Sequence, residues 1–375
     1  MQARRKKLSR LSAQYADVAQ AATGKHEIAD LDVFPLREPV SRRAYTLVRI
    51  RTQSGQVGYG ECEAVSRRDV ESFRQLLMGR AASAYMGATI GSAMDAAVCC
   101  AMLDLVGQAC SAPLYRVLGG PTRRKVRVMI TLQGSTDAEL AASLSSGLHA
   151  GYRAFAVPIP APASRNQGQA YIKQVRARLE ALRSAAGDGI DFVLDAAGKL
   201  SPGDASSIAA DLERFHLLWF DEPCATSNLE RIRRIAEQTV TPLGFGRNFP
   251  NPSAFQDFLR MGVMDIARPN LLRDGILSIR RIAALAETYY VAVAPHHEGG
   301  PVATAAAIHL AASLPNFFIQ QIPFPGAEAD RAMRSELLLR PVEEVNEGFV
   351  ALPDGPGLGI TVNERALEKY RDSES

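Results

Sequence analysis

Residues 191–297 contain five short apolar runs, and polar side chains stand at or near the end of each run. The runs are DFVLDA (191–196), LLWFDEP (217–223), PLGFGR (242–247), MDIARPN (264–270) and VAVAPHH (291–297). Segments of helical length separate them. Short apolar strands that alternate with helices are typical of parallel α/β folds. This part of the chain therefore predicts parallel strands with polar groups gathered at their carboxyl ends.

The same alternation extends on both sides of this stretch. Further apolar runs are VRVMITL (126–132), RAFAVPI (153–159) and FFIQQ (317–321). Helical patterns lie between the runs, at 136–151, 169–187, 204–215, 228–238, 252–262, 276–289 and 301–314. So many strand–helix repeats favour a (β/α) barrel of the TIM type over a doubly wound sheet. Because no GxGxxG or GxxxxGK[ST] motif follows any of these runs, dinucleotide-binding and P-loop functions are disfavoured.

The residues before Pro121 follow a different pattern. Three strands, at 28–36, 45–52 and 57–63, form an antiparallel meander, and helical patterns follow at 69–80 and 92–109. The second of these helices is apolar almost all round, so we expect it to be buried. The fold class is therefore α/β, with an α+β module placed before the barrel.

Composition limits the range of partners. The chain of 375 residues has 43 Lys and Arg against 40 Asp and Glu, a net charge of +3. Charges this balanced argue against nucleic acid and anionic membranes as partners, which leaves a small molecule. No apolar run approaches the roughly 18–20 residues that cross a bilayer. Five cysteines without CxxC spacing argue against a zinc site, and we expect a cytoplasmic protein.

The polar residues at the strand ends are the candidate site. They are Asp195, Glu222, Arg247, Asn270, His296 and Gln321. Any one of them could instead cap the following helix, since Asp and Asn favour that position. Burying so many polar groups without partners would cost roughly 1–3 kcal/mol each. We therefore expect them to converge on one cavity at the carboxyl ends of the strands.

Several motifs together resemble a known family. They are VGYGECE (57–63), AMLDLVGQACSAPLYRVLGG (101–120), GYRAF (151–155), FDEP (220–223), RPNLLRDGILSIRRIAALAE (268–287) and APHHEGGPVATAAAIHLAASLPNFFIQQ (294–321). In order and spacing the chain resembles the enolase superfamily, its mandelate racemase/muconate lactonizing enzyme-like subgroup, and most closely the sugar-acid dehydratases of the galactonate, gluconate and mannonate type.

The resemblance implies a domain division and an assembly. We expect a basic, poorly ordered tail at 1–24, an α+β capping domain at 25–122, the barrel at 123–339, and a segment at 340–375 that returns to the cap. Proteins of this family are commonly dimers or octamers, so we also expect a homo-oligomer.

The resemblance also implies a Mg²⁺ site, with three acidic ligands on successive strand ends. Asp195 and Glu222 fall on the first two ligand positions, and Arg247 falls on the third. A guanidinium offers no lone pair to a metal. We therefore expect Arg247 to bridge Asp195 and Glu222 in place of the ion, although Mg²⁺ could still bind at those two carboxylates. Arg268 would add a second positive charge.

The acid–base groups that the resemblance implies are altered as well. Ala156 and Pro158 stand where relatives carry lysines, and neither transfers a proton. His296 remains as the candidate base, with Asn270 in place of its orienting Asp; the Asn carbonyl could accept its Nδ1–H. Gln321 stands where relatives carry an acid. The residues predicted to bind a substrate are Arg247, Arg268, Asn270, His297, Glu298 and Gln321.

Three functions fit these residues. The first is a lyase or isomerase that removes the proton α to the carboxylate of a hydroxy acid or sugar acid without the usual metal. The second is a non-catalytic acid-sugar-binding or scaffold protein. The third is a Mg²⁺-dependent dehydratase or racemase in which Asp221 or Glu298 supplies a ligand.

In the cap, Glu61 and Glu63 favour a solvent-exposed charged hairpin.

Overall fold

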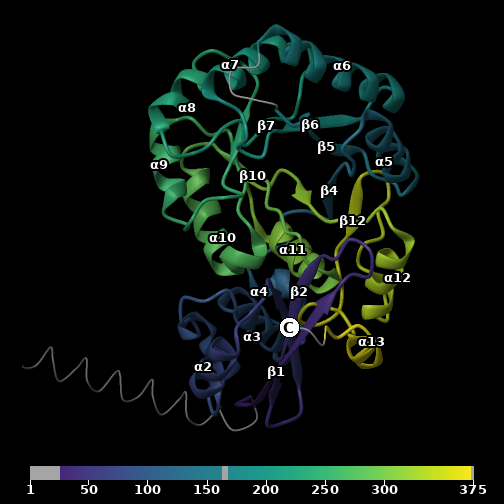
Figure 1. The fold of residues 1–375 in the computed structure, drawn as a ribbon. Coiled ribbons are helices and arrows are strands. Elements are labelled where there is room, and N and C mark those ends of the chain that lie inside the picture. The colour runs from purple at the N-terminus through teal and green to yellow at the C-terminus, as the bar shows by residue number, and fades with distance from the viewer. Residues whose placement is uncertain (1–25, 163–167, 373–375) are drawn as a thin grey trace, which may run out of the picture.

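Eight parallel strands form the wall of a barrel (Figure 1). The computed structural model describes residues 26–162 and 168–372, and the predicted tail at 1–24 lies outside them. The strands are β4 (Lys125–Thr131), β5 (Ala154–Pro158), β6 (Asp191–Asp195), β7 (Phe220–Asp221), β8 (Leu243–Phe245), β9 (Ile266–Ala267), β10 (Ala292–Val293) and β11 (Gln320–Gln321). They pair in the order β10-β9-β8-β7-β6-β5-β4-β11. Parallel bridges between Val293 and Phe317 and between His296 and Gln321 join the last two runs, so the ring closes.

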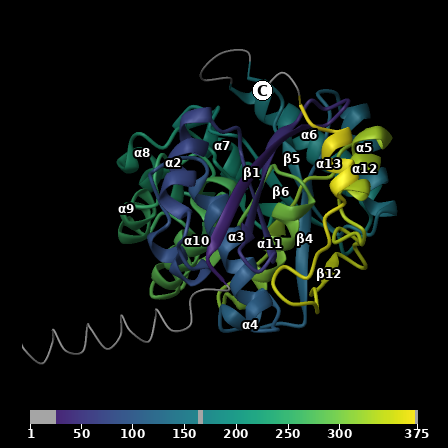
Figure 2. The same cartoon turned by 90° about the horizontal axis from the view of Figure 1, so that it is seen from below.

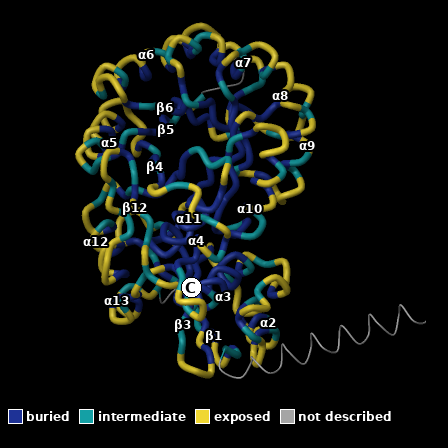
Figure 3. Tube along the Cα trace, turned by 180° about the vertical axis from the view of Figure 1, so that it is seen from behind, coloured by how far each residue is buried: buried dark blue, intermediate teal, exposed yellow. Residues whose placement is uncertain are grey.

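Helices surround this ring. They are α5 (Asp137–His149), α6 (Gln169–Ala186), α7 (Pro202–Asp211), the short 3₁₀ helix η2 (Glu213–Phe215), α8 (Leu229–Ala236), α9 (Ala254–Met261), α10 (Leu271–Glu287) and α11 (Pro301–Ser313). Figure 3 shows their outer faces exposed and the centre of the ring buried. Each of the α-helices in this set follows a strand, which confirms the predicted (β/α) barrel of the TIM type.

The barrel interior is filled by side chains rather than open. A buried apolar cluster there includes Met129, Ala156, Val193, Trp219 and Ile266. Small residues on some strands leave room for Trp219, which is fully buried. Because these side chains fill the interior, the polar groups at the strand ends lie above a packed layer.

The N-terminal module covers one side of the barrel (Figure 2). It contains the antiparallel strands β1 (Ile28–Arg37), β2 (Ala44–Thr52) and β3 (Val57–Cys62), and the helices α2 (Arg67–Leu77), η1 (Ala82–Gly87), α3 (Asp95–Ala109) and α4 (Leu114–Val117). Helix α3 packs against both β3 and α10. Gly58 and Gly60 permit this contact, because they lack a Cβ. A Cβ on Gly58 would lie 2.2 Å from the carbonyl oxygen of Ala101, and one on Gly60 would lie 1.9 Å from that of Ala97. The buried apolar helix predicted at 92–109 is confirmed.

The C-terminal segment lies against both parts of the molecule. It contains α12 (Glu328–Leu337), β12 (Phe349–Ala351) and α13 (Glu364–Lys369). Strand β12 pairs antiparallel with β4 of the barrel. Glu364 accepts a hydrogen bond from Tyr59 of the N-terminal sheet at 2.7 Å. The exact domain division at 122/123 and 339/340 stays a prediction.

Helix α10 begins earlier than its apolar pattern predicted. The sequence placed its start at residue 276, whereas the structure begins it at Leu271, directly after Asn270. Gly275 interrupts the helix with a φ of 70°, a left-handed conformation that favours glycine. None of the described helices is both long enough and apolar enough to span a membrane.

Candidate functional site

Two aspartates end neighbouring strands at the same level. Asp195 closes β6 and Asp221 closes β7, and the two are partners in the parallel register. Both side chains are buried. Two buried carboxylates at adjacent strand ends repel each other unless a cation lies nearby.

Arg247 is that cation. Its Nη1 donates to Asp195 Oδ2 at 2.5 Å and to Asp221 Oδ2 at 3.1 Å. Burial lowers the pKa of Arg247, but the charges of Asp221 and Asp195 outweigh it and raise the pKa above its ordinary value. The guanidinium therefore stays protonated and joins the two carboxylates.

Glu222 is not part of this bridge, which corrects the prediction that Arg247 links Asp195 to Glu222. Its Oε1 instead accepts from the backbone N–H groups of Gly246 and Arg247, at 2.8 Å each. Burial, followed by the charge of Asp221, raises the pKa of Glu222 to about 7. Successive strand residues point to opposite sides, so Asp221 and Glu222 cannot both face Asp195.

Arg268 supports Asp221 from inside the barrel. It is fully buried, and its Nε donates to Asp221 Oδ1 at 3.0 Å. Its remaining nitrogens donate to the Ala294 carbonyl and to Gln321 Oε1. Burial raises the pKa of Asp221, but Arg268 and then Arg247 outweigh it, so the net pKa is lowered. Arg268 and Gln321 are thus engaged with protein groups, and this favours a role in holding Asp221 over contact with a substrate.

His296 is buried without a hydrogen-bond partner. It is 4% exposed, and neither ring nitrogen has a partner among the described residues. Burial, followed by the charges of Arg247 and Arg268, holds its pKa well below the ordinary value. The imidazole is therefore neutral near pH 7, and neither of its buried nitrogens is engaged by another described residue.

Asn270 does not orient His296, although the two lie on bridged strand ends. Its Oδ1 accepts from the N–H of Leu272 at 3.0 Å and so caps α10. The prediction that Asn270 accepts Nδ1–H of His296 is wrong. The first N–H groups of a helix need acceptors, and the Oδ1 atom of Asn270 serves as one of them.

His297 and Glu298 lie toward the cap and not beside Asp195. The Nδ1 atom of His297 accepts from the N–H of Gly299 at 3.3 Å, and its Nε2 lies 3.4 Å from Thr304 Oγ1. Glu298 is exposed and pairs with Arg43 of the cap at 3.2 Å. These contacts favour a role at the joint between cap and barrel, and a substrate-binding role for the two residues stays a prediction.

Glu61 is buried, which corrects the expectation of a solvent-exposed hairpin there. Its carboxylate accepts from the N–H groups of Gly300 and Ala303, where α11 begins. The N-cap residue Gly300 has no side chain to offer as an acceptor, so Glu61 supplies one from the cap. Burial raises the pKa of Glu61 to about 7, and Arg334 partly offsets this.

The strand-end cluster is formed by five residues: Asp195, Asp221, Arg247, Arg268 and His296. Its two aspartates and two arginines balance in charge. Within residues 26–162 and 168–372, the Nε and Nη2 atoms of Arg247 make no hydrogen bond, and its side chain is 19% exposed. This edge of a guanidinium can bind a carboxylate through two parallel hydrogen bonds.

These residues do not fit a magnesium ion as they are arranged. Mg²⁺ requires a near-octahedral set of oxygen ligands, and here a guanidinium nitrogen lies between the two aspartates. Glu298 is directed to Arg43, and Glu222 to two backbone N–H groups. The described residues contain no group of three or more His, Cys, Asp or Glu placed to hold a metal.

The acid of the DE pair that bonds to the Arg247 side chain is Asp221, whereas the sequence had predicted Glu222. Trp219 directly precedes β7, two residues before Asp221, and its Nε1 atom donates to Asp221 Oδ1 at 2.8 Å. Side chains two apart on a strand share a face. A buried Trp at the third residue of LLWFDEP was therefore a signal that Asp221 faces the barrel interior.

Comparison with known proteins gives consistent matches. Residues 139–366 match the family described as enolase C-terminal domain-like. The chain is 25% identical to a D-xylonate dehydratase from Haloferax volcanii, over 96% of this chain and 93% of that protein. It is 28% identical to a D-galactonate dehydratase from Verminephrobacter eiseniae, over 88% of this chain and 91% of that protein.

Solved structures share the fold. A mandelate racemase/muconate lactonizing enzyme-like protein from Rubrobacter xylanophilus superposes with a TM-score of 0.82 at 23% identity, covering 93% of this chain and 98% of that one. A mandelate racemase/muconate lactonizing enzyme from Jannaschia sp. gives a TM-score of 0.80 at 26% identity, with 92% and 98% covered. These matches agree with the barrel and its N-terminal cap.

Proposed function

The chain belongs to the enolase C-terminal domain-like family, in the sugar-acid dehydratase branch of the enolase superfamily, and we propose that it removes the proton α to the carboxylate of a small hydroxy acid or sugar acid without Mg²⁺. One observation carries the metal-free part of this proposal. Arg247 Nη1 is bonded to both Asp195 and Asp221, so a fixed positive charge lies between the carboxylates.

In this proposal Arg247 binds the substrate carboxylate. Its side chain is 19% exposed, and the Nε and Nη2 atoms, which bond to no described residue, match the two oxygens of a carboxylate. When the α-proton leaves, negative charge develops on those oxygens. A preorganised guanidinium stabilises that charge, with a smaller electrostatic effect than a divalent ion would supply.

His296 acts as the base. Its neutral imidazole takes the α-proton, so the α-carbon–hydrogen bond breaks and the electron pair moves into the enediolate. The imidazolium then returns the proton to the hydroxyl on the β-carbon, which leaves as water while a carbon–carbon double bond forms. The net reaction is loss of one water molecule, and the resulting enol converts to a ketone. If His296 returns the proton to the α-carbon instead, the substrate is re-formed with its original configuration, because racemisation needs a second proton donor on the opposite face and Ala156 and Pro158 of β5 supply none.

A turnover assay tests this proposal. We would incubate the protein with D-galactonate, D-gluconate and D-xylonate after EDTA treatment, and measure the keto acid formed. We expect at least one of these acids or a close homologue to be consumed at the same rate with and without EDTA. His296→Asn should lower kcat by about 10²–10⁴-fold. Loss of turnover in EDTA with recovery in Mg²⁺, or full activity of His296→Asn, would overturn the mechanism.

A second candidate is an acid-sugar-binding protein without catalysis. It is favoured by the lack of a hydrogen-bond partner for the His296 ring among the residues that the structure describes, and by Ala156 and Pro158 on β5, which carry no proton-transfer group. Under this alternative the acids would bind and raise the Tm, and Arg247→Gln would abolish that increase. No product would form under any metal condition.

A further inference from the structure

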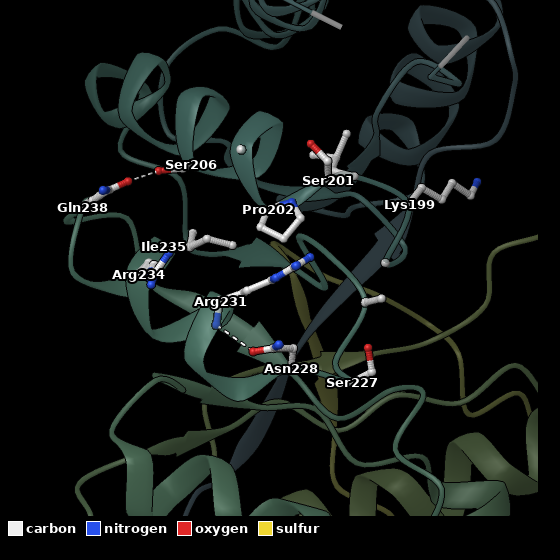
Figure 4. Close-up of a pocket in the computed structure, with 14 residues that line it drawn as sticks. Lys199, Ser201, Pro202, Ser206, Ser227, Asn228, Arg231, Arg234, Ile235 and Gln238 are labelled. Atoms are coloured by element: carbon white, nitrogen blue, oxygen red, sulfur yellow. Dashed lines mark hydrogen bonds between the residues drawn. The ribbon is translucent and has the colours of Figure 1, made fainter. Parts of the chain in front are cut away.

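A surface cavity of about 690 Å³ lies between α7 and α8 (Figure 4), and no residue of the strand-end cluster lines it. Its walls come from the loops that follow β6 and β7 and from the facing sides of the two helices. This volume lies within the range of small-molecule sites. The proposed reaction uses none of its lining residues.

The charge of the cavity has one sign. Lys199, Arg231 and Arg234 line it, and no Asp or Glu does. Together these three side chains carry a charge of +3, the same as the net charge of the whole chain. A concave wall lined by one sign of charge concentrates counter-ions. Hydroxyl and amide groups that can also bind an anion, such as those of Ser227 and Asn228, complete the lining.

The arginines of the cavity differ from their neighbour on the same helix. Arg233 of α8 pairs with Glu230 at 3.0 Å and with Glu237 at 2.6 Å. In the part of the chain that the structure describes, the side chains of Arg231 and Arg234 make neither an ion pair nor a hydrogen bond. Like charges at i and i+3 on a helix repel each other. A bound anion would remove that repulsion.

The side chains are placed around the opening of the cavity. Figure 4 shows Arg231 extending from α8 toward Pro202, where α7 begins. A hydrogen bond from Ser206 to Gln238 closes one end, and Lys199 lies at the opposite end. The Arg231 side chain therefore extends across the cavity, and its guanidinium N–H groups bond to no described residue.

We propose that this cavity binds a small dianionic group, either a phosphate or a dicarboxylate. Arg231 and Arg234 each carry a planar guanidinium whose N–H groups can bind two oxygens of such an anion at once. Lys199 adds a third positive charge. This site is separate from the strand-end cluster, so the proposal does not depend on the proposed function.

Isothermal titration of the full chain at pH 8 and low ionic strength tests the site, with inorganic phosphate and malonate as the two probes, both of which are dianions at that pH. We expect saturable binding with one site per chain, and the tighter probe identifies the headgroup as phosphate or dicarboxylate. Arg231→Gln and Arg234→Gln should each weaken binding about ten-fold or more, as expected for hydrogen bonds to charged groups. Arg233→Gln removes the same charge from the same helix and should leave the Kd unchanged.

All three arginines are exposed, so the variants should keep the Tm of the parent chain. Absence of saturable binding of both probes to the parent chain would overturn the proposal. Equal weakening by Arg233→Gln would show attraction by net charge alone and would also overturn it. So would full affinity in the double variant Arg231→Gln, Arg234→Gln, since the anion would then lie elsewhere.

Discussion

Two buried ionic networks in this molecule differ in how completely their groups are paired. The strand-end cluster leaves one edge of Arg247 and both ring nitrogens of His296 without partners among the described residues. The second network, the junction cluster, joins cap to barrel and consists of Glu38, Glu61, Arg334 and Glu343. There Arg334 donates to Glu38, Glu343 and the Gly299 carbonyl.

The difference separates a structural joint from a candidate site. In the junction cluster Arg334 is buried, and its hydrogen bonds are directed to the cap, the barrel and the C-terminal segment. All three guanidinium nitrogens of Arg334 are thus bonded to protein groups, and this favours a structural role. In the strand-end cluster the unused groups follow β8 and β10, at the carboxyl ends of the strands, which is where barrels of this type bind ligands.

The largest effect on stability should come from breaking the junction cluster. Arg334→Met would remove the 2.9 Å pair of the buried Glu38 and leave it only the longer contact of 3.6 Å to Arg43 among the ion pairs of the described residues, so we expect a loss of about 3–5 kcal/mol in the free energy of unfolding. Chemical denaturation measures it. Lys369→Met removes an exposed pair with Glu336 and serves as the control, with little expected change. Equal losses in the two variants would mean that the junction cluster does not hold the cap.

A smaller effect is expected from the pH dependence of the same cluster. Burial raises the pKa of Glu61 to about 7, above the value of about 4.3 in an unfolded chain. Between these values the folded state binds more protons than the unfolded state, so this group makes stability fall as pH rises from about 4.5 to 7. Glu61→Gln should remove part of that decline, on the order of 1 kcal/mol.

Denaturation midpoints of parent and Glu61→Gln between pH 5 and 8 measure this contribution. Glu63→Gln is a matched control, because its side chain lies two residues away and is exposed. A parent curve with the same slope as that of Glu61→Gln would contradict the assignment.

The smallest effect should come from Asn270. Because its side chain caps α10, Asn270→Ala should cost about 1 kcal/mol of stability and leave kcat within two-fold of the parent. Asn363→Ala, which removes the side-chain cap of α13, gives the matched helix-cap control. A large fall in kcat for Asn270→Ala alone would mean that Asn270 positions His296 after all.

The barrel was predictable because its signals are local. Each apolar run is short and is followed by an amphipathic helix, and this period is visible without any tertiary contact. The positions of Asp195, Arg247 and His296 at strand ends follow from the same pattern. The α3 helix was also predictable, since a helix that is apolar all round must be covered on both sides.

The partners of these side chains were less predictable. The choice between Asp221 and Glu222 depends on which face of a two-residue strand points inward, and a run of apolar residues does not fix that face. The burial of Glu61 depends on α11, which lies more than 200 residues away in the chain. Asn270 could equally have capped a helix or held a histidine, because one oxygen can serve either donor.

The central claim is that Arg247 occupies the place of the metal ion. Isothermal titration of Mg²⁺ into EDTA-treated protein tests it directly, with Arg247→Glu as the comparison that supplies a third carboxylate beside Asp195 and Asp221. We predict no saturable binding to the parent chain at millimolar Mg²⁺, and one new site in Arg247→Glu. Stoichiometric binding of Mg²⁺ to the parent chain would contradict the claim.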